Sequence, residues 1–401
     1  MRVFRKAAKI WQEETCINFS EDSRARDRIV VFYGPGCYSM IGRVGGVQVI
    51  SLGRGCEWVG LAAHEIGHAL GFYHTQSRHD RDDFITLDFQ NFKPQWISQF
   101  TKQTEHTNYN YNLTYDYGSV MHYGATGVSL NGQPAVIPRD IKYVPALGSH
   151  MISFYEKLMM NLHYKCLDIC RRESSAKCKN GGFPHPRDCS KCICPSGYGG
   201  RLCDERPSGC GKTLTATSSY QTLEDSVGEK NARYAKDEFE MCHYWIQGPP
   251  GSTIEVVLDS FPRGVAVDGC HFAGVEIKTG SDIRHSGYRF CSPNYAGTSL
   301  VSTHHIVPII TYSRAIEIKT VFRYRLASLV RDQLIRRLPM QLLNQQKGQL
   351  LNQQRSLLGH QRKLLDQQRI QVLPTHVAET LTYVLHWQNG TSVILTSTTA
   401  R

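Results

Sequence analysis

The chain has 401 residues, fourteen cysteines and a formal net charge of +11. Ten Lys or Arg and two Asp lie between positions 323 and 369, so this stretch accounts for +8 of the total. The basic balance is therefore a property of one segment and does not indicate a nucleic-acid partner. An even number of cysteines favours an oxidising compartment over the cytosol, and no apolar run is long enough to span a membrane.

The first eleven residues, MRVFRKAAKIW, predict an amphipathic helix. Apolar side chains recur there at helical spacing: Val3, Phe4, Ala7, Ala8, Ile10 and Trp11. The stretch is basic but lacks the apolar centre of an export signal. Because the cysteines require secretion, we expect the export signal to lie upstream of residue 1. A cytosolic protein is the alternative.

Residues 64–74 read HEIGHALGFYH and predict a metal site. His64 and His68 are four residues apart, so on a helix both rings project from one face. Gly71 can take the positive φ that ends a helix, which allows His74 to approach the same point. Three neutral imidazoles leave a fourth position for water, as in catalytic zinc sites, and Glu65 could take a proton from that water. The alternative is a histidine-rich patch on an ordinary helix, which does not explain the full pattern.

A second stretch, YDYGSVMHY at 115–123, supports the same interpretation. Met121 in a short turn would form a soft apolar floor beneath the imidazoles without competing as a ligand. Tyr123 would bring a phenol to the metal, either as a further ligand or as a donor to the oxyanion. Alone, the stretch would indicate only packing residues; together with the upstream motif it indicates an active site.

The extended histidine motif followed by this methionine turn resembles the metzincins. Within them, HEIGHALGFYHTQSRHDRDDF and SVMHY are similar to the astacin family of secreted zinc endopeptidases, and the modules that follow are nematode-astacin-like. The resemblance runs from about residue 3 to residue 166. It implies one zinc ion held by His64, His68 and His74. It also implies Glu65 as general base and acid, and Tyr123 as the tyrosine that stabilises the transition state.

Two features depart from the family pattern. Many members carry Glu directly after the third histidine, where it pairs with the new amino terminus once the pro-segment is removed; this chain has Thr75. We therefore expect that link to be absent or made by water. The pattern also places a signal, a pro-segment and a first strand upstream of residue 1. A missing strand favours the alternative to an active enzyme, a catalytically inactive extracellular binding protein.

The cysteines fall into three groups. Four lie in or next to the protease-like segment, and the resemblance implies the pairs Cys16–Cys166 and Cys37–Cys56. Six more lie between positions 170 and 203, a stretch that must depend on disulfides because it can enclose little core. Its ending resembles an EGF-like module, which implies Cys170–Cys189, Cys178–Cys192 and Cys194–Cys203, although spacing alone does not establish connectivity. The CSKC sequence leaves a zinc knuckle as the alternative, which would require a second such pair.

The last four cysteines lie in a segment of alternating apolar and polar residues. TIEVVLDSF, GVEIKTG and SRAIEIKTVFRYR predict strands, with turn signals such as PPG between them. The segment resembles a β-sandwich of the CUB type, which implies the pairs Cys210–Cys242 and Cys270–Cys291. Some CUB domains bind calcium through acidic residues, and Asp268 is the nearest candidate. The remaining acidic positions do not align, so the interpretation we favour is a structural sandwich without a metal.

The segment 326–373 is rich in Gln, Leu and Arg and contains no cysteine. Leucine doublets begin at positions 342, 350, 357 and 364, but each heptad holds only one doublet and the intervening stretch is polar. We expect a disordered or partly helical tail, with an oligomerisation coiled coil as the alternative. LTYVLHWQNGTSVILTS within 374–401 predicts a hairpin around Asn-Gly.

Three sequons for N-glycosylation occur, at Asn18, Asn112 and Asn389. We expect glycosylation at Asn389 and at Asn112, which lies in an Asn/Tyr-rich loop. Asn18 is a doubtful site because we place it beside Cys16 at the start of a strand.

Together these features predict a multidomain secreted protein. Its parts are an α+β metzincin protease domain with a twisted sheet and an active-site helix (1–166), an EGF-like module (167–205), an all-β CUB sandwich (210–325), the low-complexity tail (326–373) and the C-terminal segment (374–401). We expect it to hydrolyse peptide bonds of extracellular proteins by metal-activated water. The EGF-like and CUB modules would present substrates, or bind matrix or cell surfaces, an expectation that depends on family analogy.

Overall fold

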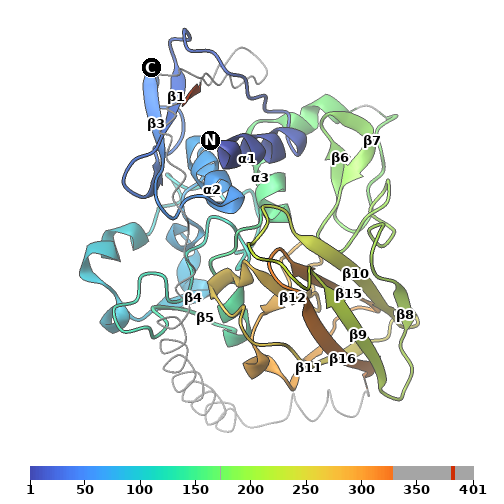
Figure 1. Cartoon of the computed structure of the whole chain (residues 1–401). Helices are drawn as coiled ribbons and strands as arrows, with labels where there is room; N and C mark the ends of the chain where they lie inside the picture. The colour runs from blue at the N-terminus through green and yellow to red at the C-terminus, as the bar shows by residue number, and fades with distance from the viewer. Residues whose placement is uncertain (172, 328–380, 384–401) are drawn as a thin grey trace.

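The computed structural model describes residues 1–171, 173–327 and 381–383. Figure 1 shows an N-terminal domain (residues 1–166) beside a β-sandwich (residues 210–327), with a small cysteine-rich module (residues 167–205) next to both. The expected tail at 326–373 falls almost entirely outside the described residues.

Three α-helices lie in the N-terminal domain: α1 (Arg2–Glu13), α2 (Val59–Ala69) and α3 (Phe154–His163). The amphipathic helix predicted at the start of the chain is confirmed, because α1 buries Val3, Phe4 and Trp11. The Trp11 indole N–H donates to the carbonyl oxygen of Ala63 at 3.0 Å, which satisfies a buried donor and joins α1 to α2.

The main sheet of this domain has the strand order β17-β1-β3-β2. Its strands are β1 (Arg28–Phe32), β2 (Cys37–Ser39), β3 (Val47–Leu52) and β17 (Leu381–Tyr383). Strands β1 and β3 run parallel, β2 is antiparallel to β3, and β17 is antiparallel to β1. The described part of the predicted C-terminal hairpin is therefore a strand on β1; the rest of that hairpin, including Asn389, lies outside the described residues.

Asn18 does not lie at the start of a strand, as we expected, because no named strand begins before Arg28. Its side chain is exposed in the connection between α1 and β1. Asn112 is also exposed, in a turn where its φ is 57°.

Two small two-stranded sheets lie outside the main sheet and the sandwich, one in the N-terminal domain and one in the cysteine-rich module. They pair β4 (Ile85–Leu87) with β5 (Val136–Pro138), and β6 (Phe183–His185) with β7 (Asp188–Ile193).

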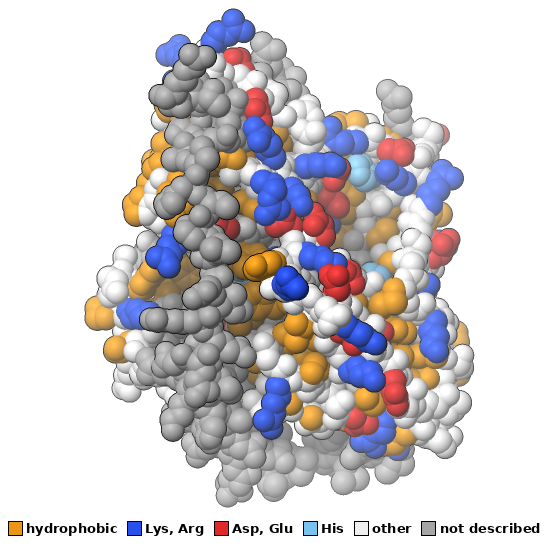
Figure 2. Space-filling view, viewed as in Figure 1, with side chains coloured by type: hydrophobic (Ala, Val, Ile, Leu, Met, Phe, Trp, Pro, Cys, Tyr) orange, Lys and Arg blue, Asp and Glu red, His pale blue; other side chains and the backbone are white. Residues whose placement is uncertain are grey.

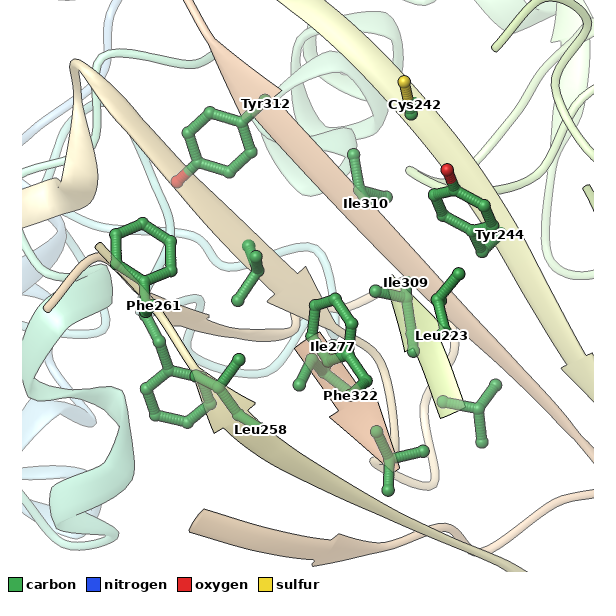
Figure 3. Packing of buried hydrophobic residues seen from close by; sticks show 14 of the residues in the cluster. Leu223, Cys242, Tyr244, Leu258, Phe261, Ile277, Ile309, Ile310, Tyr312 and Phe322 are labelled. Atoms are coloured by element: carbon green, nitrogen blue, oxygen red, sulfur yellow. The ribbon is translucent and has the colours of Figure 1, made fainter. Parts of the chain in front are cut away.

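The sandwich consists of a five-stranded sheet, β13-β12-β15-β10-β8, and a four-stranded sheet, β14-β11-β16-β9. The strands are β8 (Thr213–Thr215), β9 (Gln221–Val227), β10 (Glu240–Gln247), β11 (Ile254–Ser260), β12 (Ala273–Ile277), β13 (Tyr288–Phe290), β14 (Thr298–Val301), β15 (Ile306–Ser313) and β16 (Ile318–Leu326). The three strand predictions are confirmed as β11, β12 and β16. Figure 3 shows side chains from both sheets meeting in one core, among them Ile277, Ile309 and Phe322.

All fourteen cysteines lie within the described ranges and form disulfides. The structure brings together the seven pairs that the family resemblances imply: Cys16–Cys166, Cys37–Cys56, Cys170–Cys189, Cys178–Cys192, Cys194–Cys203, Cys210–Cys242 and Cys270–Cys291. The Cys16–Cys166 bond closes the N-terminal domain on itself over 150 residues of sequence. Among the described helices, none is long and apolar enough to cross a membrane.

The sandwich packs directly against the N-terminal domain. Basic side chains of α1 meet acidic ones of the sandwich, where Lys6 pairs with Asp237 at 2.9 Å; Figure 2 shows mixed basic and acidic side chains over this region. Asp268, the calcium candidate, lies half-buried at the interface between the two domains. Its carboxylate accepts hydrogen bonds from the backbone N–H and the hydroxyl of Thr126 at 2.7 and 2.8 Å. Asp268 therefore binds the neighbouring domain in this structure.

Candidate metal centre and active site

Helix α2 carries the first two histidines of the candidate metal site. The helix is apolar around nearly its whole circumference, and the only residue of it that is not buried is Leu61. His64 and His68 are 9% and 6% exposed, and Glu65 between them is 4% exposed. The spacing of four residues therefore puts both imidazoles on one buried face, as predicted.

Helix α2 ends at Ala69, and Gly71, two residues later, has a φ of 110°. The Gly71 N–H donates to the carbonyl oxygen of His68 at 2.9 Å, and the Phe72 N–H donates to that of Gly67 at 3.0 Å. This is the sharp helix end that glycine favours. The chain then reverses and brings His74 back to the rings of α2.

The three rings converge on one point through their Nε2 atoms. The Nε2 atom of His74 lies 3.2 Å from that of His64 and 3.0 Å from that of His68. Three imidazoles bound tetrahedrally to one zinc ion would have nitrogens about 3.3 Å apart. The ligand atoms of these three histidines lie within 4.8 Å of one another, close enough to hold one metal ion.

Backbone carbonyls orient the rings of α2. The Nδ1–H of His64 donates to the carbonyl oxygen of Val120 at 2.7 Å, and that of His68 donates to Phe72 at 2.7 Å. Because each Nδ1 carries the proton, each Nε2 is unprotonated and directs its lone pair at the common point. Lone pairs that converge in this way repel one another unless a cation lies between them, so the donor set fits zinc.

Burial keeps the imidazoles neutral. Desolvation, followed by the charge of His68, lowers the pKa of His64 to about 3. Desolvation also lowers the pKa values of His68 and His74. A neutral imidazole is the form that binds a metal ion, so the site needs no deprotonation step at neutral pH.

Glu65 is a buried carboxylate beside these rings. Its Oε2 atom has no hydrogen-bond partner among the residues that the structure describes. Desolvation raises its pKa to about 8, which makes it a far stronger base than an exposed carboxylate. It opens with the histidines onto a cleft of about 330 Å³ whose other lining includes Ser77, Ser98 and Gln99.

The 115–123 segment lies beneath the histidines. Met121 is 1% exposed, and a Cβ placed on Gly67 would lie 2.7 Å from its sulfur. Gly67 therefore leaves room for Met121. The sequence alone did not indicate this role of Gly67. The ring of Tyr123 lies 4.4 Å from that of His74 between centroids. Desolvation, followed by the charge of Glu65, raises the pKa of Tyr123 to about 12.

Glu156 holds the turn that carries Met121, a role that the sequence did not predict. Its carboxylate accepts hydrogen bonds from the Ser119 hydroxyl at 2.5 Å and from the Met121 N–H at 3.1 Å. It also caps α3, because it accepts from the Ser153 N–H while the Ser153 hydroxyl accepts from the Glu156 N–H. The S-x-x-E pattern at 153–156 is a capping-box signal that could have predicted the cap, although nothing local predicts the contact with the turn.

Thr75 follows the third histidine, where the family pattern often has Glu. Its hydroxyl lies 2.7 Å from that of Ser119. It lines a second cavity of about 240 Å³ together with Arg78, Asp116 and Glu156.

Comparison with known proteins identifies the family. The model of Astacin, a family of peptidases, matches residues 1–165. The zinc metalloproteinase nas-31 of Caenorhabditis elegans is 50% identical over 325 residues, which cover 81% of this chain and 53% of that protein. The zinc metalloproteinase nas-25 of the same organism is 36% identical over 331 residues, 80% of this chain and 82% of that protein.

A solved structure of high choriolytic enzyme 1, a hatching-enzyme zinc protease from the medaka Oryzias latipes, is 36% identical. The match covers 41% of this chain and 82% of that one, with a TM-score of 0.39. The chain spans about half the length of the first curated relatives it matches, between 50% and 53%. With the three convergent imidazoles and Glu65 beside them, the match to the Astacin family model and the similarity to nas-25 show that the chain belongs to the astacin family of zinc metallopeptidases.

Proposed function

We propose that this protein is a secreted zinc endopeptidase that cleaves extracellular proteins or peptides. The observation that carries the proposal is the convergence of three neutral imidazoles beside a buried carboxylate that has a raised pKa. The seven disulfides support an extracellular location. The presence of all three histidines together with Glu65 argues against the alternative, a catalytically inactive binding protein.

His64, His68 and His74 would hold the zinc ion. A bound zinc ion supplies Lewis acidity, which acidifies water and polarises a carbonyl oxygen. The Glu65 carboxylate takes the proton from the attacking water and later passes it to the leaving amine. The Tyr123 phenol stays protonated because its pKa is about 12, so it can donate a hydrogen bond to the oxyanion that forms on the substrate.

The remaining modules would serve binding. Three disulfides support an EGF-like assignment for residues 167–205, and two facing sheets with two disulfides support a CUB-type sandwich at 210–325. We infer that they bind substrate, matrix or cell surfaces. Asn112, exposed in its turn, is the best described candidate for a glycan.

The variant Glu65→Gln tests this function. It keeps the shape of the side chain and removes the base, so zinc content should be unchanged while kcat falls by at least about a hundredfold. The measurements are zinc content by atomic absorption and hydrolysis of a denatured protein substrate. Activity equal to that of the unchanged, zinc-loaded protein would show that Glu65 is not the base.

A further inference from the structure

The loop between β12 and β13, residues 278–287, packs against the segment that carries Met121 and Tyr123. The loop belongs to the sandwich, and the segment belongs to the N-terminal domain. His285 of the loop donates from Nε2–H to the carbonyl oxygen of Tyr115 at 2.6 Å. Its ring lies among three tyrosine rings of the N-terminal domain, with centroid distances between 5.7 and 6.1 Å: Tyr117, Tyr143 and Tyr155.

Ser286 makes the closest approach. Its hydroxyl donates to the Asp116 carboxylate at 3.2 Å. A Cβ placed on Gly118 would lie 2.5 Å from the Ser286 Oγ and 2.6 Å from its Cβ. The backbone at Gly118 and the Ser286 side chain therefore occupy adjoining space with no room for another atom. A displacement of either one must displace the other.

The same segment reaches the metal site from its other side. Val120, two residues after Gly118, provides the carbonyl that orients His64 at 2.7 Å. The Tyr123 N–H donates to the side-chain oxygen of Gln76 at 3.0 Å. A shift of Gly118 would therefore be transmitted to the ring orientation of His64 and to the position of Tyr123.

Buried and paired groups make the loop a rigid support. The Tyr155 hydroxyl donates to the Asp282 carboxylate at 2.5 Å, so helix α3 holds the middle of the loop. The Gly287 N–H donates to Glu276 at 3.0 Å. Glu276 also pairs with Arg289 at 2.9 Å, and both side chains are 4% exposed. Removing one partner of a pair so deeply buried would leave the other charge unpaired away from water, so the pair holds the loop ends in place.

We propose that His285 and Ser286 of the sandwich are positioning residues for the active site: they fix the 115–123 segment, and through it the orientation of His64 and the placement of Tyr123. The sandwich would then be part of the catalytic unit as well as a binding module. This inference rests on the peptidase function proposed above. An interface that only stabilises the fold would make the same contacts, so the test needs a measurement that separates the two roles.

The test is a pair of compensating substitutions in the full chain. Gly118→Ala introduces the methyl group that Ser286 leaves no room for. We expect kcat to fall about tenfold to a hundredfold, with KM changed less than about threefold and zinc affinity lowered about tenfold or more. Adding Ser286→Gly removes both clashing atoms, and the next neighbour, Arg289, lies 3.4 Å from the new Cβ. The double variant should recover most of the lost kcat.

Ser299→Gly is the matched control. Ser299 lies in β14 of the other sheet and donates to Glu255 at 2.8 Å, so it makes a comparable hydrogen bond away from the segment. This variant should keep the kcat of the unchanged protein. At His285, Ala should lower kcat, and Gln, which keeps an N–H at similar reach, should restore part of it.

Three results would overturn the inference: a Gly118→Ala variant as active as the parent, a double variant no better than Gly118→Ala, or a kcat loss fully explained by the unfolded fraction in thermal denaturation. The rate of the zinc-loaded parent tests the proposed function separately. If the parent is inactive, zinc affinity measured by chelator competition still decides the positioning role, because Val120 orients His64 whether or not catalysis follows.

Discussion

Two side chains at the active site, the buried Glu65 and the half-buried Tyr123, have raised pKa values that suit different tasks. Burial raises the pKa of Glu65 to about 8, which makes its carboxylate a stronger base. Burial raises the pKa of Tyr123 to about 12, which keeps its phenol a hydrogen-bond donor at neutral pH. Near neutral pH, Glu65 can therefore exchange its proton, as a base that later acts as an acid must, whereas Tyr123 keeps its proton.

The variant Tyr123→Phe tests the donor role. It removes one hydroxyl and leaves the ring that packs against His74. We expect kcat to fall about a hundredfold to a thousandfold, with zinc content and KM little changed. Tyr198→Phe is the control, because Tyr198 lies in the cysteine-rich module and burial raises its pKa to about 12 as well. Zinc loss in parallel with activity would mean that Tyr123 is instead a ligand.

At the scale of elements, the metal site depends on the C-terminal end of α2 as well as on the face that carries His64 and His68. The helix places two imidazoles together by its own periodicity. The third arrives only because Gly71 reverses the chain at a φ of 110°. The helix end is therefore part of the metal site.

Gly71→Ala should weaken zinc binding through the backbone. Among the residues that the structure describes, a Cβ at this position would meet only His163 Nε2, at 3.9 Å, so the substitution creates no steric clash with them. The strained φ should cost about 1–2 kcal/mol of folding free energy and reduce zinc affinity about tenfold or more. Gly264→Ala is the matched control, since Gly264 has a φ of 100° with open space around it, in the sandwich. Both variants should lose similar stability, and equal zinc affinity in the two would contradict the role given to Gly71.

At the scale of the whole molecule, the sandwich and the N-terminal domain share a further, partly buried contact close to α2. The rings of His150 and His271 stack at 4.2 Å with an interplanar angle of 8°. Arg314 of the sandwich donates to Nδ1 of His150 at 3.1 Å and lies 4.6 Å from the centre of the Trp58 ring. A positively charged group thus lies against two imidazoles that burial keeps neutral.

This contact makes stability depend on pH. Desolvation, followed by the charges of neighbouring groups, lowers the pKa of His150 to about 2 and that of His271 to about 4. Below about pH 6.5, the unfolded chain binds protons that the folded protein does not. The free energy of unfolding should therefore fall with decreasing pH, by about 1.4 kcal/mol per pH unit for each histidine. For His271 this fall should continue down to about pH 4.

The measurement is chemical denaturation between pH 7.5 and 4.5. His150→Asn keeps an acceptor for Arg314 and removes one titrating group, so its stability should fall less steeply than that of the unchanged protein. The comparison at pH 7.5, where both histidines are neutral in either state, sets the baseline for the substitution itself. Identical slopes in the two proteins would contradict the assignment to His150.

Much of the metal site could be predicted from the sequence because it is local. Helical periodicity and one glycine are enough to bring together His64, His68 and His74, which span eleven positions. The amphipathic α1 and three strands of the sandwich followed from periodicity in the same way. The start of a strand at Asn18 was wrong, because the chain from α1 runs on as a loop until Arg28.

What the sequence by itself determined about this protein is its set of chemical groups and the local geometry that presents them. Only the tertiary structure decided what holds those groups in place: the carbonyl of Val120 behind His64, Met121 against Gly67, Glu156 under the turn, and Ser286 against Gly118. These contacts join residues between about 35 and 170 positions apart. No periodic pattern encodes such pairs, because they depend on how whole elements pack rather than on the conformation of any one of them.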